Sequence, residues 1–170
     1  MRRKKNIIDD LALRMRFEEV TDDEIITLIS ENVQDLEMGD RAGATLLWHA
    51  AFLNRRKLAE WLIGHGANIN TQDENGFSAL HGATQEKHID MVSYMLQNVA
   101  NVNIQDKFGN TPLMRTDRAT PTELLRILLE NGTDVDIKNI AGVSFRDITI
   151  ANPLTQELLD KYFTSLEKQE

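Results

Sequence analysis

The chain has 170 residues, a hydrophobic fraction of 41% and no cysteine, so it can bury a core but lacks disulfides, thiolate nucleophiles and cysteine-ligated zinc. Its formal net charge is −8, and four positive residues lie together at positions 2–5. Nucleic-acid binding by the folded part is therefore disfavoured, because neutralising phosphates requires a basic face.

Residues 1–6 are predicted to form a basic, solvated tail. The apolar stretch that follows is only Ile7 and Ile8 before Asp9, far shorter than the apolar region of a signal peptide. No run in the sequence approaches the ~20 apolar residues that span a bilayer. We therefore expect a soluble, cytoplasmic protein that does not bind membranes.

A helix is predicted after Thr21. The string Thr21-Asp-Asp-Glu24 is a capping-box pattern, in which the threonine and glutamate side chains each accept a bond from the other residue's backbone N–H. An apolar set of helical spacing follows, made up of Ile25, Ile26, Leu28, Ile29 and Val33.

The sequence then repeats with a fixed period. Glycine recurs every 33 residues, and an aspartate or asparagine stands three residues before each of Gly43, Gly76, Gly109 and Gly142. This spacing is typical of a turn, because glycine adopts positive φ without a steric penalty. A period of this length indicates a solenoid of stacked units. Three full units are predicted at residues 40–72, 73–105 and 106–138.

Each unit carries the pattern of two helices. A hydroxyl residue suited to cap the first helix follows each turn, at Thr45, Ser78, Thr111 and Ser144. The second helix has a broad apolar face that can pack on both neighbouring units. In the third unit, Thr120 is predicted to cap the second helix and Pro121 to lie in the first turn of that helix. Gly66 and Gly132 are predicted to end the second helices in left-handed conformation, and Val99 stands at the same place in the middle unit.

Two positions depart from this pattern. Val99 would be strained by roughly 1–2 kcal/mol in a left-handed conformation, and the alternative is that the cap shifts to Asn98. Asp117 replaces a small residue of the third inner helix, so it must point outward or pair with Arg115 or Arg118. We expect this inner helix to be the least stable part of the stack.

Three strings closely resemble the ankyrin repeat: Gly76-Phe-Ser-Ala-Leu-His81, Gly109-Asn-Thr-Pro-Leu113 and Gly66-Ala-Asn-Ile-Asn70. The resemblance is strong over residues 40–138 and weaker in the flanks. It implies an all-α solenoid of helix-turn-helix units with β-turn fingers and a concave binding face. We expect one domain of five units, in which residues 7–39 and 139–170 form the terminal caps.

No catalytic site, metal site or cofactor is predicted. The histidines are His49, His65, His81 and His88, and no pair of them has the spacing and the glutamate of a zinc hydrolase. The sequence also lacks a glycine-rich phosphate loop and a nucleophile elbow. The ankyrin resemblance implies instead a structural hydrogen bond at His81.

The same resemblance implies that a partner binds through the finger tips and the exposed side of the first helices. The predicted partner-binding residues are Arg41, Phe52, Glu74, Phe77, Gln85, Lys107, Phe108, Asn110, Arg115 and Arg118. The three phenylalanines stand out, because aromatic anchors among mixed charges are typical of interface centres. The alternative is that each phenylalanine packs against its own unit. For Trp48, which replaces the usual histidine, packing is favoured over binding.

We interpret the chain as a non-catalytic protein-interaction module. Because almost the whole chain is predicted to be stack, it is expected to be a monomer that inhibits or neutralises a partner protein by occupying its surface. The acidic body suits a basic partner, with electrostatics mainly speeding the encounter. The alternatives are an assembly scaffold, an adaptor of the bacterial effector type and, least favoured, an enzyme with an unrecognised site.

Overall fold

The computed structural model describes residues 6–17, 19–117, 119–149 and 153–166, so the predicted basic charges at 2–5 lie outside it. Within these ranges the chain forms helices and turns and no strand, which confirms the all-α class. The elements are α1 (Ile7–Phe17), α2 (Asp22–Asn32), α3 (Leu46–Phe52), α4 (Arg56–Gly64), α5 (Ala79–Gln85), α6 (Ile89–Gln97), the 3-10 helix η1 (Pro112–Arg115), α7 (Thr122–Glu130), α8 (Phe145–Thr149) and α9 (Pro153–Leu166).

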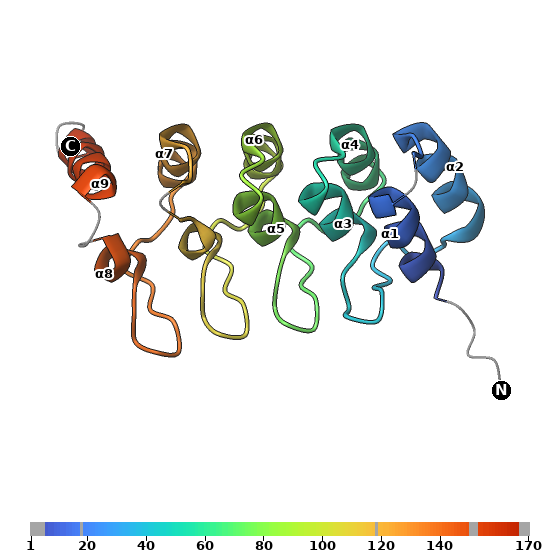
Figure 1. Cartoon of the computed structure of the whole chain (residues 1–170), viewed down its shortest axis with the longest axis horizontal. Helices are drawn as coiled ribbons and strands as arrows, with labels where there is room; N and C mark the ends of the chain where they lie inside the picture. Colours follow the sequence, from blue (N-terminus) through green and yellow to red (C-terminus); the bar gives the residue numbers. More distant parts are fainter. Residues whose placement is uncertain (1–5, 18, 118, 150–152, 167–170) are drawn as a thin grey trace.

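The helices lie in two rows (Figure 1). The outer row contains α2, α4, α6, α7 and α9, and the inner row contains α1, α3, α5, η1 and α8. Along the inner row, α1 contacts α3, α3 contacts α5, and α5 contacts η1. The helices α1 and α2 lie at one end of this elongated stack and α9 lies at the other (Figure 1). The division into five units, with the outer two as caps, stays a prediction.

The core runs between the two rows. Small residues are buried in the inner row, among them Ala50 and Ala51 of α3 and Ala83 of α5, and their size lets neighbouring helices approach closely. The outer row contributes large side chains at four-residue spacing on one helix face: Leu58, Leu62, Met91, Met95, Leu124 and Leu128. Burying each of these stabilises the fold by about 1.5–3 kcal/mol.

Four loops, which we call fingers 1 to 4, precede α3, α5, η1 and α8 and project to one side (Figure 1). They comprise residues 40–44, 73–77, 106–110 and 139–143. In finger 1, Asp40 Oδ1 accepts the backbone N–H groups of Ala42 and Ala44 at 2.8 and 3.0 Å. Asp73, Asp106 and Asn139 repeat both bonds in the later fingers, at 2.7–3.1 Å.

The turn glycines are required by conformation, and at Gly76 and Gly109 by space as well. Their φ angles lie between 75° and 80°, in the left-handed region. At Gly76, an added Cβ would also lie 2.6 Å from the backbone nitrogen of Lys107, which belongs to the next finger. The period of 33 residues therefore reports contacts between fingers as well as the turn inside each finger.

Backbone hydrogen bonds join neighbouring fingers into a ladder. The rungs run from Glu74 N–H to the Ala42 carbonyl, from Lys107 N–H to the Asn75 carbonyl and from Ile140 N–H to the Phe108 carbonyl, at 2.8–2.9 Å. At the N-terminal end, Oδ1 of Asp9 in α1 accepts the Arg41 N–H at 3.1 Å. The Asp9 carboxylate thus takes the place that a preceding finger would occupy.

Most predicted helix caps are confirmed. The capping box of Thr21 and Glu24 is present, and side-chain oxygens accept the N–H three residues on at Thr45, Ser78 and Ser144. The prediction for Thr111 is wrong, because its side chain makes no cap bond. Pro112 follows it without an N–H, and the turn tightens so that Met114 N–H bonds the Thr111 carbonyl at 3.0 Å.

The predictions for the rest of the third inner helix are partly wrong. Pro121, not Thr120, holds the N-cap position of α7. The Thr120 hydroxyl instead accepts the Asp117 N–H at 2.9 Å, which closes a local turn. The carboxylate of Asp117 points outward and pairs with Lys87 at 2.9 Å rather than with Arg115. These local bonds compete with the second turn of the helix.

The outer helices end in left-handed conformation as predicted. Gly66 and Gly132 have φ angles of 91° and 81°. Val99 also has a positive φ, 59°, whereas φ at Asn98 is −99°. The alternative that the cap shifts to Asn98 is therefore wrong, and a β-branched residue holds a conformation that suits glycine.

Candidate partner-binding surface

The predicted binding residues that the structure describes belong to one surface, which we call the finger face: the fingers together with the inner row. Arg41, Glu74 and Lys107 are exposed at equivalent places in fingers 1, 2 and 3. Their charges alternate in sign along the ladder. This part of the surface is therefore polar and not dominated by either charge.

The most exposed aromatic residue of the fingers is Phe108, at 56%. Next to it lies Ile140 of finger 4, whose side chain is 75% exposed and whose N–H bonds the Phe108 carbonyl at 2.9 Å. We call these two residues the apolar tip pair. Ile140 was not predicted, although an isoleucine at the place that Arg41, Glu74 and Lys107 hold was a signal that could have found it.

Phe77 and Arg115 are engaged within the fold. The Arg115 guanidinium lies 4.3 Å from the centre of the Phe77 ring, and the His81 ring lies 5.4 Å from it on the inner row. Arg115 also forms an ion pair with the buried carboxylate of Asp106. These contacts hold fingers 2 and 3 to the inner row, and both predicted residues remain only half-buried.

The ionisation of Asp106 follows from these bonds. Burial alone would raise the pKa of Asp106, but hydrogen bonds from the Asn110 N–H, Arg115 and the Phe108 N–H outweigh burial and lower the pKa below its ordinary value. Asp106 therefore stays ionised in the folded protein near neutral pH. Its role is to order finger 3.

The same spacing of nine residues pairs Asp40 with His49 in finger 1, at 3.0 Å. Burial lowers the pKa of His49 by more than the hydrogen bond to Asp40 raises it. His49 is therefore mainly neutral at neutral pH. In finger 2 this spacing reaches Gly82, which has no side chain to pair with Asp73.

Phe52 fills the space beside Gly82. A Cβ added at Gly82 would meet Phe52 side-chain atoms at 3.6 Å. The Phe52 ring stacks on Trp48, with centroids 5.0 Å apart, and the Phe52 carbonyl is 3.0 Å from Nε2 of His88. Phe52 is thus half-buried against its own and the next repeat, and Trp48 packs as expected.

The remaining predicted residues differ in their surroundings. Gln85 is exposed at the end of α5. Asn110 is half-buried and links fingers 3 and 4, because its Oδ1 accepts from Asn139 at 3.0 Å while its carbonyl bonds Nε2 of His81. The bond to His81 is a structural bond of the kind that the ankyrin resemblance implied. Arg118 lies outside the described residues.

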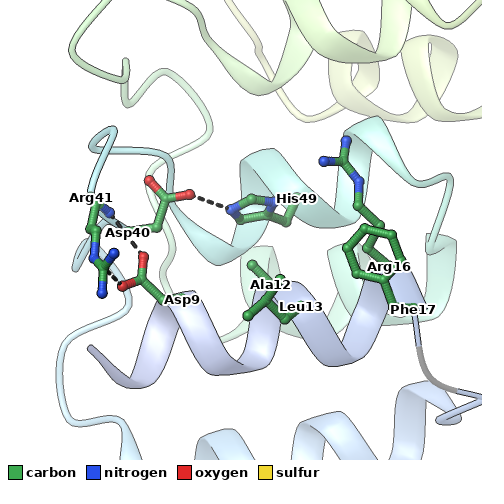
Figure 2. Close-up of a pocket in the computed structure, with 8 residues that line it drawn as sticks. All are labelled: Asp9, Ala12, Leu13, Arg16, Phe17, Asp40, Arg41 and His49. Atoms are coloured by element: carbon green, nitrogen blue, oxygen red, sulfur yellow. Dashed lines mark hydrogen bonds and ion pairs between the residues drawn. The ribbon is translucent and has the colours of Figure 1, made fainter. Parts of the chain in front are cut away.

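The structure adds a hollow of about 310 Å³ between α1, α3 and finger 1 (Figure 2). We call it the α1 hollow, and its lining residues are Asp9, Ala12, Leu13, Arg16, Phe17, Asp40, Arg41 and His49. Sequence reasoning assigned only Arg41 of these to binding. A signal was present in α1, where Leu13 and Phe17 form a second apolar pair away from the face that buries Ile8, Leu11 and Met15.

No group of three or more histidine, aspartate or glutamate side chains in the described part of the chain could hold a metal ion. Among the same residues, no helix is long and apolar enough to cross a membrane.

Two relatives are similar to part of this chain. The protein fem-1 homolog A-like of Mus musculus is 29% identical over 69 residues, which is 41% of this chain and 11% of that protein. The ankyrin repeat domain-containing protein OPG015 of Monkeypox virus is 30% identical over 81 residues, 43% of this chain and 18% of that protein. The similarity thus spans less than a fifth of either relative.

A family model described as ankyrin repeats, in three copies, matches residues 47–139, more than half of the chain. Ankyrin repeats generally bind other proteins, and the family is typically non-catalytic. The stacked helix pairs, the projecting fingers and this match agree. The chain belongs to the ankyrin-repeat family.

Proposed function

We propose that the protein binds another protein across the finger face and inhibits or neutralises it by occupying its surface. The observation that carries this proposal is the apolar tip pair, Phe108 and Ile140, exposed on adjacent finger tips. Large apolar side chains grouped on a rigid surface favour protein association and are a liability for a protein without a partner.

The charge of the protein supports a basic partner. The net charge of −8 attracts cationic proteins at a distance, and this long-range attraction mainly raises the association rate. A scaffold role, the alternative, requires the chain to associate with itself or to bind two partners at once.

The proposal is tested by capturing binding proteins from the native host on the immobilised full chain. Phe108→Ala and Ile140→Ser are each expected to lose the captured proteins, because truncating an interface anchor typically costs about 1–4 kcal/mol of binding. Val99→Gly is the matched control, since it removes another exposed apolar side chain, at the end of α6. Recovery of the same proteins by the parent and by both tip variants would contradict the proposal.

A further inference from the structure

We infer that the α1 hollow receives a segment of the partner protein in which a large apolar side chain is flanked by acidic residues. The apolar side chain packs against Leu13 and Phe17, and the flanking carboxylates meet Arg16 and Arg41. This inference rests on the proposed function, because it names the chemistry that the N-terminal end of the finger face recognises.

The hollow has an apolar wall that nothing in the described chain covers. Leu13 and Phe17 are four residues apart on one side of α1 and are 53% and 75% exposed. Figure 2 shows Ala12 and Leu13 at the middle of the hollow, with Phe17 toward one end. A volume of about 310 Å³ is enough for one large apolar side chain. Covering this wall would remove apolar surface from water.

The carboxylates of the hollow are already used inside the fold. Asp9 accepts the Arg41 N–H with Oδ1, and its Oδ2 lies 3.0 Å from Nε of Arg41. Asp40 accepts two backbone N–H groups with Oδ1 and faces His49 with Oδ2. Both side chains are mostly buried. The hollow therefore holds its two carboxylates at buried positions, where they contact other groups of the fold.

The guanidinium groups, by contrast, face solvent. The Arg41 side chain is 77% exposed, and its ion pair with Asp9 uses Nε, which leaves the two terminal nitrogens available. Arg16 is exposed and lies 5.5 Å from the centre of the Phe52 ring, and no carboxylate of the described residues pairs with it. Figure 2 shows these two arginines at opposite ends of the hollow.

The formal charges of the hollow thus balance, and its exposed charged groups are the two guanidiniums. Arginine binds carboxylates in a planar, bidentate geometry, and partial removal of water strengthens such bonds. One guanidinium at each end of an apolar wall is complementary to an acidic residue on each side of an apolar one. A basic partner can carry such a segment locally.

The probes for the test are two blocked nine-residue peptides, each with one central tryptophan in a neutral background. One peptide has glutamate on both sides of the tryptophan, and the other has lysine. Backbone amide shifts of the full, ¹⁵N-labelled chain are followed during titration. The glutamate peptide is expected to shift the amides of Ala12, Leu13 and His49 saturably, to bind about tenfold more tightly than the lysine peptide, and to weaken with salt.

Arg16→Glu is the decisive variant, because it reverses a charge without breaking an ion pair of the fold. It is expected to remove or reverse the preference for the glutamate peptide. Arg126→Glu is the matched control, because Arg126 is exposed on α7, lies outside the hollow and forms no ion pair with another described residue, and it is expected to leave the preference unchanged. Equal binding of the two peptides, no binding, or shifts confined to other surfaces would each overturn the inference.

A second copy of the chain is the competing occupant. Sedimentation that shows a dimer in the parent and a monomer in Leu13→Ser would assign the hollow to self-association and overturn the inference.

The proposed function and this inference can fail independently of each other. If Phe108→Ala loses the captured partner while neither peptide binds the hollow, this inference fails and the proposed function stands. If partner capture survives the tip variants, the proposed function fails independently of the peptide result.

Discussion

Among the described residues with a positive φ, Val99 is the β-branched one, and its side chain suits that conformation least. Its φ of 59° falls in the left-handed region, where a β-carbon crowds the following carbonyl. The side chain is 84% exposed, so burial does not compensate for this strain. At the equivalent Gly66, no atom lies within 4 Å of an added Cβ, so conformation alone distinguishes the two positions.

Val99→Gly is therefore expected to stabilise the protein by about 1 kcal/mol. The relief of roughly 1–2 kcal/mol of strain is partly offset by the greater flexibility of glycine in the unfolded chain, which costs roughly 0.5–1 kcal/mol. Urea denaturation gives the free energy of unfolding. Gly66→Val is the reverse control and is expected to lose a similar amount. A parent chain as stable as Val99→Gly would show that the Val99 backbone is not strained.

The burial of the His81 ring makes the stability of the protein depend on pH. The ring is fully buried, and its Nδ1 accepts the Ser78 N–H at 3.2 Å, which places the proton on Nε2 toward the Asn110 carbonyl. Burial is the largest cause that lowers the pKa of His81. The neutral ring is thus the form that the fold stabilises.

The free energy of unfolding is expected to be greatest above pH 6.5 and to fall as the pH drops below it. The reason is that the unfolded chain, in which the histidine pKa is about 6.5, then binds protons that folded His81 and His49 do not. Each histidine contributes a slope of at most about 1.4 kcal/mol per pH unit. Urea denaturation between pH 5 and 8 measures the slope, and His81→Gln should reduce it. Stability that is flat or rises on acidification to pH 5.5 is the opposing result.

At the scale of elements, the inner row is uneven. The helices α3 and α5 each have seven residues, whereas η1 has four. Pro112 removes a donor at the start of η1, and the turn between Asp117 and Thr120 replaces its second half. A 3-10 turn has poorer hydrogen-bond geometry than an α-helix. The third inner element is therefore the least regular of the central stack.

Backbone amides of η1 are expected to exchange with solvent faster than those of α3 and α5. Few helical hydrogen bonds must open to expose them, and regions of this kind open locally at low free-energy cost. Hydrogen exchange followed by NMR at Met114 and Thr116, with the middle of α5 as the internal reference, measures the difference. Equal protection in the three inner elements would show that tertiary packing compensates for the short turn.

The sequence predicted the elements whose residues follow the period. Fingers and outer helices recur every 33 residues, because each finger bonds the next at the same separation in sequence. Their residue pattern therefore occurs several times in the chain. The cap predictions for Thr111 and Thr120 were wrong. Pro112 lacks an N–H and tightens the turn after Thr111, and the Thr120 hydroxyl bonds Asp117 instead of capping α7. Such competition depends on neighbouring side chains and not on the period.

The binding surface was predicted less well than the fold. Phe52 occupies the space beside Gly82 of the next repeat, and that contact cannot be read from either residue alone. The α1 hollow was missed because α1 departs from the repeat consensus, so no family position pointed to Leu13 or Phe17. Their exposure depends on how α1 packs on α3, which only the structure reveals.

At the scale of the whole molecule, charge and shape divide the finger face into two ends. The N-terminal end carries the α1 hollow with its outward guanidiniums, and the C-terminal end carries the apolar tip pair. Between them, alternating charges lie on fingers that the backbone ladder holds in register. A partner that contacts both ends must therefore be elongated or wrap along the stack.

The constant offset of the ladder bonds also limits how this gene can change length. Duplicating or deleting a whole block of 33 codons would reconnect each donor with an equivalent acceptor, so copy number can vary without new contacts having to arise. A shift by a single codon inside a finger would misalign donor and acceptor on both sides. The stack can thus lengthen or shorten by whole repeats, while the helices at its two ends stay the same.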